Sequence, residues 1–127
     1  MTSTATTRAT VRAYHEARFR GDVPAAAATL AEPFRFASPL IASDSASEHL
    51  AGLGMFLGTV EGVDLVSELY GEAEATLVYD VRTTLPAVGV QRTAEHFRLT
   101  GGRISGIRLI FDATPWHAVM RAAGLVS

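Results

Sequence analysis

Two segments with the alternation of β-strands, at about residues 90–100 and 104–111, are separated by Gly101-Gly102, and this arrangement constrains the fold more than any other part of the sequence. Paired glycines readily adopt the positive φ angles that a tight β-hairpin turn requires. We therefore expect the two segments to form adjacent antiparallel strands.

The first of these strands carries an acid, Glu95, on its apolar face. Strand side chains alternate, so Glu95 shares a face with Phe97 and Leu99. Placing an ionised carboxylate among apolar side chains costs free energy. We interpret Glu95 as a pocket acid that can give a proton or hydrogen bond to a ligand oxygen. The alternatives are a structural acid satisfied by Tyr14, Arg92 or a backbone amide, and an outward-facing residue after a one-residue slip in register.

The rest of the chain predicts helices before a run of strands. The helices are expected at residues 6–20, 24–30, 45–58 and 114–124, with strands at 34–38, 63–70 and 75–85 besides the two above. Thr114 is expected to cap the last helix, and Asp112 to bond a turn amide or support that cap. This order favours one α+β domain, residues 1–127, in which a curved antiparallel sheet wraps over the N-terminal helices and can enclose a pocket.

Composition excludes several kinds of chemistry. The sequence contains no cysteine and no lysine, which removes thiol nucleophiles, disulfides and Schiff-base lysines. A formal charge of −2 gives no electrostatic reason to bind nucleic acid or an anionic membrane. The four histidines show no metal-binding spacing, so we expect no metal site and no cofactor. We expect a cytoplasmic protein.

Several short motifs resemble a known superfamily. They are Val11-Arg-Ala-Tyr14, Phe36-Ala-Ser-Pro39, Glu95-His-Phe-Arg98 and the segment Ile110 to Trp116. With the order of elements, they make nearly the whole chain similar to the nuclear transport factor 2-like superfamily, in its branch of SnoaL-like polyketide cyclases and ketosteroid isomerases. The resemblance implies a cone-shaped, cystatin-like α+β fold. It does not settle function, because the superfamily includes isomerases, cyclases, hydrolases and non-enzymes.

The resemblance to ketosteroid isomerase implies roles for particular residues. Tyr14 falls at the place of the oxyanion tyrosine, and Glu95 at the place of the protonated acid. Where that family carries its base, this chain has Ser38, which cannot abstract an α-proton unaided. Asp80 is a further candidate acid. An ungapped alignment to the isomerase pattern places Asp80 inward, whereas the apolar alternation around Tyr79 places it outward.

A set of mostly apolar residues is expected to line the pocket. It comprises Phe34, Phe36, Ser38, Leu53, Phe56, Tyr79, Phe97, Leu109, Phe111 and Trp116. Taken as composition alone, these residues indicate only a core. If they surround a cavity, the cavity suits an apolar, ring-containing molecule held by a few polar groups.

The sequence leaves two hypotheses about function. The first is a cofactor-independent enzyme of the SnoaL-like type that acts on a hydrophobic carbonyl or epoxide compound by general acid–base catalysis, with Glu95, Tyr14 and Asp80 as its catalytic candidates. The second is a non-catalytic module that binds a small ligand or dimerises. Under both we expect a homodimer formed through the outer sheet face, where Val78 lies.

Overall fold

The computed structural model describes residues 3–124. Its helices are α1 (Thr4–Arg20), α2 (Val23–Ala27), α3 (Ala46–Ala51), α4 (Leu53–Leu57) and α5 (Thr114–Ala122). Its strands are β1 (Leu30–Ala37), β2 (Ala42–Ser43), β3 (Val60–Tyr70), β4 (Glu74–Thr83), β5 (Val90–Thr100) and β6 (Arg103–Ile110). The predicted α+β class is confirmed.

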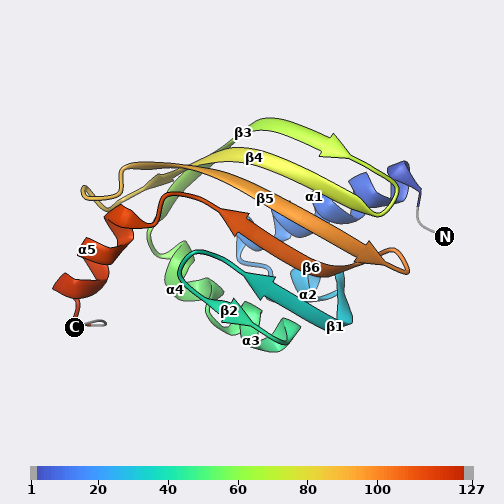
Figure 1. Cartoon of the computed structure of the whole chain (residues 1–127), viewed down its shortest axis with the longest axis horizontal. Coiled ribbons are helices and arrows are strands. Elements are labelled where there is room, and N and C mark those ends of the chain that lie inside the picture. Colours follow the sequence, from blue (N-terminus) through green and yellow to red (C-terminus); the bar gives the residue numbers. More distant parts are fainter. Residues whose placement is uncertain (1–2, 125–127) are drawn as a thin grey trace.

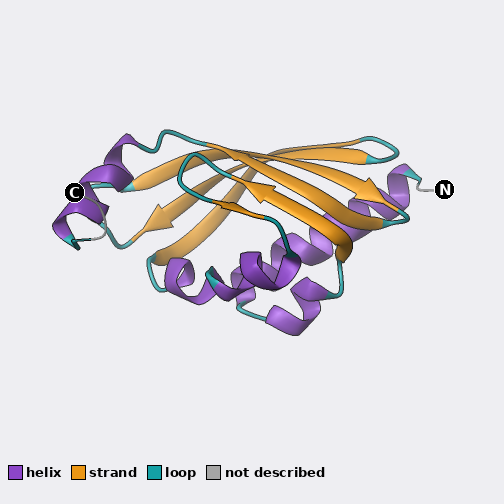
Figure 2. Cartoon of the chain, turned by 60° about the horizontal axis from the view of Figure 1, so that its bottom comes forward, coloured by secondary structure: helices purple, strands orange, loops and turns teal. Residues whose placement is uncertain are grey.

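The strands form one curved sheet with the order β2-β1-β6-β5-β4-β3 (Figure 1). The predicted antiparallel meander of β3 to β6 is present, and β1 adds to it in parallel with β6. Gly101 and Gly102 turn the β5–β6 hairpin with φ angles of 60° and 79°. Figure 2 shows α1 to α4 beneath the sheet and α5 beyond one of its ends.

The first helix ends where the sequence predicted. Ser3 caps its start by accepting a hydrogen bond from the Thr6 amide, and Gly21 ends it in the left-handed conformation with φ 76°. This conformation favours glycine because it has no Cβ. The buried face of α1 packs under the sheet and carries Val11, Tyr14 and, one turn later, Arg18.

Several element boundaries differ from the prediction, among them those of the second, third and last helices. The second helix stops at Ala27, because Leu30 is already paired with Ile104 of β6. The expected third helix is two helices, α3 and α4, which meet at Gly52, a residue with low helix propensity.

The start of α5 also differs. Thr114 is its first residue rather than its cap, and the capping position, Ala113, makes no side-chain hydrogen bond. The Thr114 amide donates instead to Asp112 Oδ1, so Asp112 has the supporting role that the sequence suggested.

The core lies between α1 and the concave face of the sheet. Its fully enclosed side chains come from both layers and include Val11, Phe34, Leu77, Phe97 and Ile104. Glu95 and Arg18 are enclosed among them, so a charged pair occupies the centre of an otherwise apolar core.

Candidate functional site

Glu95 lies inside the cone, as predicted, and is held there by two residues. Arg18 Nη1 is 2.6 Å from Oε2 and Arg18 Nη2 is 2.8 Å from Oε1. The Tyr79 hydroxyl donates to Oε1 at 2.8 Å, and Glu95 has 0% exposure. A carboxylate that accepts two hydrogen bonds from one guanidinium, in a bidentate pair, is ionised and has no proton to donate. The interpretation of Glu95 as a resting proton donor is therefore replaced by that of a charged acceptor.

Arg18 is the functional residue that the sequence interpretation missed. It follows Val11 by seven positions and Tyr14 by four, which places it on the buried stripe of α1. The other arginines of α1 lie toward solvent: Arg8 and Arg20 are exposed, and Arg12 is partly exposed. An arginine in register with an apolar stripe was the available signal, and it predicts an internal carboxylate partner.

Aromatic rings and His15 surround the guanidinium of Arg18. Its Cζ lies 4.7 Å from the ring centroid of Tyr14 and 4.6 Å from that of Phe19. Arg18 Nη2 also lies 2.8 Å from His15 Nδ1. Burial, reinforced by the charge of Arg18, lowers the pKa of His15 to about 3. His15 is therefore neutral near pH 7, and because Nδ1 accepts from Arg18, its proton resides on Nε2.

Tyr14 is fully buried, but its partner is His49 rather than Glu95. The Tyr14 oxygen and His49 Nε2 are 2.7 Å apart. Burial raises the pKa of Tyr14, and burial together with the charge of Arg18 lowers the pKa of His49 to about 4. Both groups are therefore uncharged near neutral pH. The His49 ring stacks on the buried Phe36 with centroids 4.2 Å apart, and His49 itself is partly buried.

Asp80 lies on the outer face of the sheet, away from the Glu95 cluster. Both of its oxygens accept hydrogen bonds from Arg92, at 2.7 and 2.8 Å. The apolar alternation of β4 therefore gave the correct orientation, and the ungapped alignment did not. The structure does not bring Asp80 to the candidate catalytic groups.

The expected pocket-lining residues fall into three places. Phe34, Phe36, Leu53, Tyr79 and Phe97 are core residues. Ser38 and Leu109 border an open hollow of about 270 Å³ between the ends of β1 and β6, where the Ser38 hydroxyl accepts from the Leu40 and Ile41 amides. Phe56, Phe111 and Trp116 are partly buried, and the Trp116 indole donates to Gln91.

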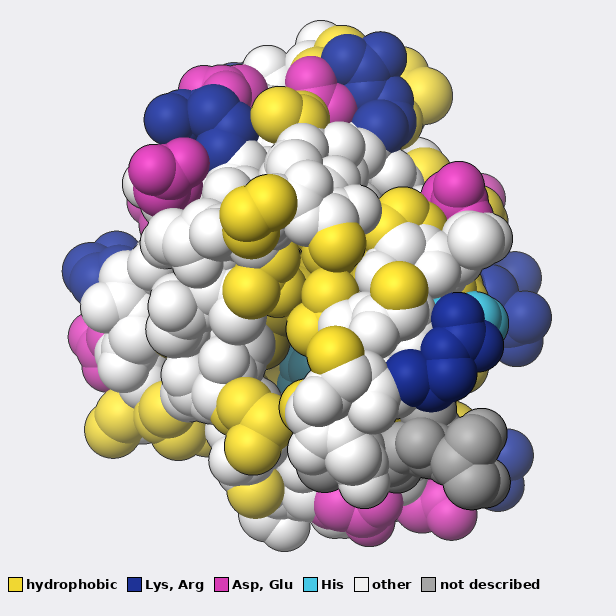
Figure 3. All heavy atoms as spheres, turned by 90° about the vertical axis from the view of Figure 1, so that its left-hand side faces the viewer, with side chains coloured by type: hydrophobic (Ala, Val, Ile, Leu, Met, Phe, Trp, Pro, Cys, Tyr) yellow, Lys and Arg dark blue, Asp and Glu magenta, His cyan; other side chains and the backbone are white. Residues whose placement is uncertain are grey.

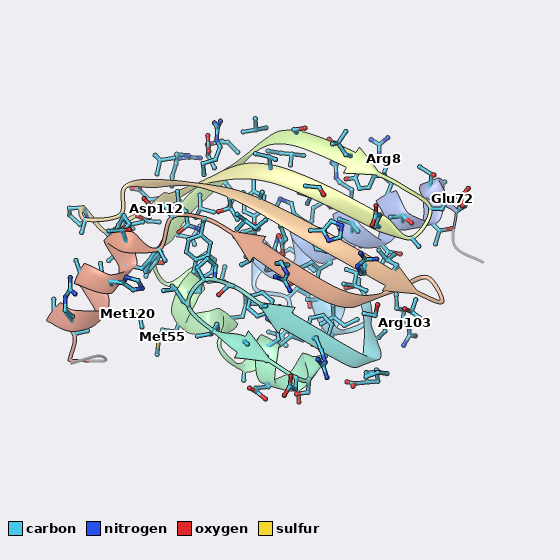
Figure 4. The ribbon with its side chains drawn as sticks, in the orientation of Figure 1. Arg8, Met55, Glu72, Arg103, Asp112 and Met120 are labelled. Carbon is cyan, nitrogen blue, oxygen red and sulfur yellow. The ribbon has the colours of Figure 1, made fainter. Side chains whose placement is uncertain are left out.

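The open end of the cone is where α4 and α5 lie. Met55 of α4 and Met120 of α5 are both at this end of the long axis (Figure 4), and Met55 is 82% exposed. Figure 3 shows apolar side chains around a hollow there, with a histidine side chain at its floor. A second open hollow of about 720 Å³ lies between α2, α3 and β1, away from the expected pocket residues.

Residues 3–124 contain neither a metal-binding cluster nor a membrane-spanning helix. No group of three or more His, Asp or Glu side chains within residues 3–124 could hold a metal ion. None of the helices in this range is long and apolar enough to cross a membrane.

Comparison with known proteins shows relatives among solved structures only. No protein-family model and no curated protein matches the chain. A protein from Kribbella flavida, described as of known function, is 30% identical with a TM-score of 0.80, over 91% of this chain and 93% of that one. A nuclear transport factor 2-like protein of unknown function from Cytophaga hutchinsonii is 19% identical, with a TM-score of 0.73 over 87% and 94% of the two chains.

A third relative carries a chemical description. It is a candidate ketosteroid isomerase from Kribbella flavida, 19% identical with a TM-score of 0.72 over 88% of this chain and 82% of that one. The curved sheet over N-terminal helices thus defines a cone-shaped α+β protein of the cystatin-like class. This chain has the fold of the nuclear transport factor 2-like proteins.

Proposed function

We propose that this protein is a cofactor-independent enzyme of the SnoaL-like type that acts on a hydrophobic carbonyl or epoxide compound by general acid–base catalysis. The observation that carries the proposal is the polar layer inside the cone, formed by Glu95, Arg18, Tyr79 and His15 with the adjacent Tyr14–His49 pair. A hydrophobic cluster of similar volume is often at least as stable as a buried ion pair, so stability alone does not account for this layer.

The Tyr14–His49 pair can bind and polarise a ligand oxygen. With its proton on Nε2, His49 donates to the Tyr14 oxygen across their 2.7 Å contact, and the Tyr14 hydroxyl proton remains for the ligand. Because burial raises the pKa of Tyr14, the hydroxyl stays protonated and can donate. A donor of this kind in an apolar site stabilises the negative charge that develops on a carbonyl or epoxide oxygen.

Glu95 is the candidate base in this scheme. Its two oxygens offer about four acceptor sites, of which Arg18 and Tyr79 occupy two on Oε1 and one on Oε2. One site on Oε2 therefore remains for a substrate proton. Asp80 has no part in the scheme, because it lies on the outer face with Arg92.

The test is a ligand screen by thermal unfolding, followed by product analysis. Wild type, Tyr14→Phe and Glu95→Gln are compared against apolar ketones, epoxides and polycyclic phenols. A ligand at about 100 times its Kd stabilises the fold by about 2.7 kcal/mol, which such a screen detects. We expect the wild type to convert a hit that the two variants only bind. Full turnover by Glu95→Gln would remove Glu95 from catalysis.

One observation favours a second function, a non-catalytic module that binds a small apolar molecule. Three hydrogen bonds already occupy the Glu95 carboxylate, and the two open hollows described above are lined by neither Glu95 nor Tyr14. Binding without conversion by the wild type and both variants supports this module over the enzyme.

A further inference from the structure

One nitrogen of the Arg18 guanidinium, Nε, has no hydrogen-bond partner within the described chain. A guanidinium has five N–H donors on three nitrogens. Arg18 Nη1 bonds Glu95, and Nη2 bonds Glu95 and His15. The Nε atom is buried and has no hydrogen-bond partner within residues 3–124, and no other buried side-chain nitrogen or oxygen there shares this condition.

An unsatisfied donor at this position is costly. A buried polar group without a partner costs about 1–3 kcal/mol, and more when the group is charged. Arg18 is 4% exposed, and the rings of Tyr14 and Phe19 pack against its guanidinium, so bulk water does not satisfy it. Half-buried Phe19 is the outer of these two rings, and it also contacts Phe56 of α4 with centroids 6.4 Å apart.

The charge around this donor is already balanced. Glu95 neutralises Arg18 through two hydrogen bonds, and His15 and Tyr79 contribute no charge near neutral pH. An anionic ligand at Nε would therefore leave a net negative charge in an apolar core, which is strongly unfavourable. An uncharged acceptor oxygen satisfies the donor without adding charge.

We infer that Arg18 Nε–H is a ligand-recognising donor, and that its pairing with Glu95 makes the site select an uncharged acceptor oxygen, such as that of a ketone, over a carboxylate. This inference rests on the proposed function and narrows its substrate class. Arg18 is then the specificity-determining residue, and Glu95 sets the charge that the site accepts.

The experiment uses three probes with one bicyclic skeleton, namely a ketone, the corresponding hydrocarbon and the corresponding carboxylate. Their dissociation constants are measured at pH 7 for wild type, Glu95→Gln and Asp80→Asn. Asp80→Asn is the matched control, because it makes the same change in a carboxylate paired with an arginine on the outer face. We expect wild type and Asp80→Asn to bind the ketone at least tenfold more tightly than the other two probes. Glu95→Gln should bind the carboxylate most tightly.

The outcomes separate this inference from the proposed function. If the ketone and hydrocarbon bind the wild type equally, a binding pocket exists but Arg18 Nε makes no hydrogen bond to the ligand, for example because a bound water occupies the donor. In that case the inference fails while the proposed function stands. An unchanged order in Glu95→Gln also overturns it. If no probe binds the wild type, the proposed function fails for this class of ligand, and the inference fails with it.

A second measurement covers the case in which Glu95→Gln does not fold. The Arg18 Nε–H signal of the wild type is followed by proton–nitrogen NMR, after assignment through its contacts with the Tyr14 and Phe19 rings. Addition of the ketone should shift this signal, and the hydrocarbon should not. A signal that responds equally to both probes overturns the inference.

Discussion

At the scale of single residues, Glu95 and Asp80 each pair with an arginine in a similar geometry. The Glu95 pair is buried, whereas the Asp80 pair lies on the outer surface. Glu95 has 0% exposure, whereas the side chains of Asp80 and Arg92 are 21% and 65% exposed. We predict that Glu95→Gln lowers the free energy of unfolding by about 3–5 kcal/mol, because it leaves Arg18 as an unpaired buried charge. Asp80→Asn should cause no measurable change. Urea denaturation followed by circular dichroism measures both, and equal losses would contradict the buried pair.

The buried His15 and the partly buried His49 predict that stability falls on mild acidification. The pKa of His49 is lowered to about 4 and that of His15 to about 3, both chiefly by burial. From about pH 6.5 downward the unfolded chain takes up protons that the folded chain does not. This stabilises the unfolded state relative to the folded state, so the free energy of unfolding falls. Each histidine contributes a slope of up to about 1.4 kcal/mol per pH unit. Urea midpoints between pH 7 and pH 5 should fall accordingly.

Two variants provide the control for this pH dependence. His49→Gln removes one of the two titrating groups, so its stability should fall less steeply with acid than that of wild type. His117→Gln replaces an exposed histidine and should keep the wild-type slope. A wild-type midpoint that does not change from pH 7 to pH 5 would contradict the neutral, buried state of these rings.

Part of the site was predictable from single positions. Side chains alternate along a strand with a strict period of two residues. This alternation correctly predicted that Glu95 points inward, and it favoured the outward orientation of Asp80 that the structure has. The partners of Glu95 were not predictable in the same way, because they are set by how α1 is rotated beneath the sheet. Arg18 is 77 positions away in sequence, and only its register with Val11 and Tyr14 indicated that it points inward.

At the scale of elements, two glycines at helix ends predict changes of opposite sign. Gly21 ends α1 with φ 76°, and a residue with a Cβ pays about 1–2 kcal/mol for this conformation. Gly52 has a right-handed conformation, and an added Cβ would meet no atom within 4 Å. We predict that Gly21→Ala lowers the free energy of unfolding by about 1–2 kcal/mol, whereas Gly52→Ala raises it by about 0.5 kcal/mol. Thermal unfolding tests this, and two changes of the same sign would contradict it.

The elements themselves were predicted better than their boundaries. The sequence placed β5 at residues 90–100, as observed, because alternation and a glycine turn define both strand and hairpin. It did not predict that Leu30 belongs to β1, since that pairing depends on Ile104 of a distant strand. The break at Gly52 was also missed, because the leucine spacing on either side suits one continuous helix.

At the scale of the whole molecule, the two faces of the sheet have different roles. The concave face encloses the core and the charged layer around Glu95. The convex face carries an apolar row across β4, β5 and β6, because Val78 pairs with Ala94 and Ala94 with Ile110. The Asp80–Arg92 pair lies beside this row, and Ile110 is 58% exposed. Such a row with a charged border has the composition of an interface core with a polar rim.

We propose that two copies associate through this apolar row, as the sequence led us to expect. Val78→Asp places a charge in the centre of the row, so it should convert the dimer to a monomer while the circular dichroism spectrum stays unchanged. Ala9→Asp is the control, because Ala9 is exposed on α1 in the helical layer and should leave the dimer intact. Sedimentation velocity across a range of concentrations distinguishes the two species. A wild-type protein that stays monomeric throughout, or a Val78→Asp variant that stays dimeric, would show that the convex face is not the interface.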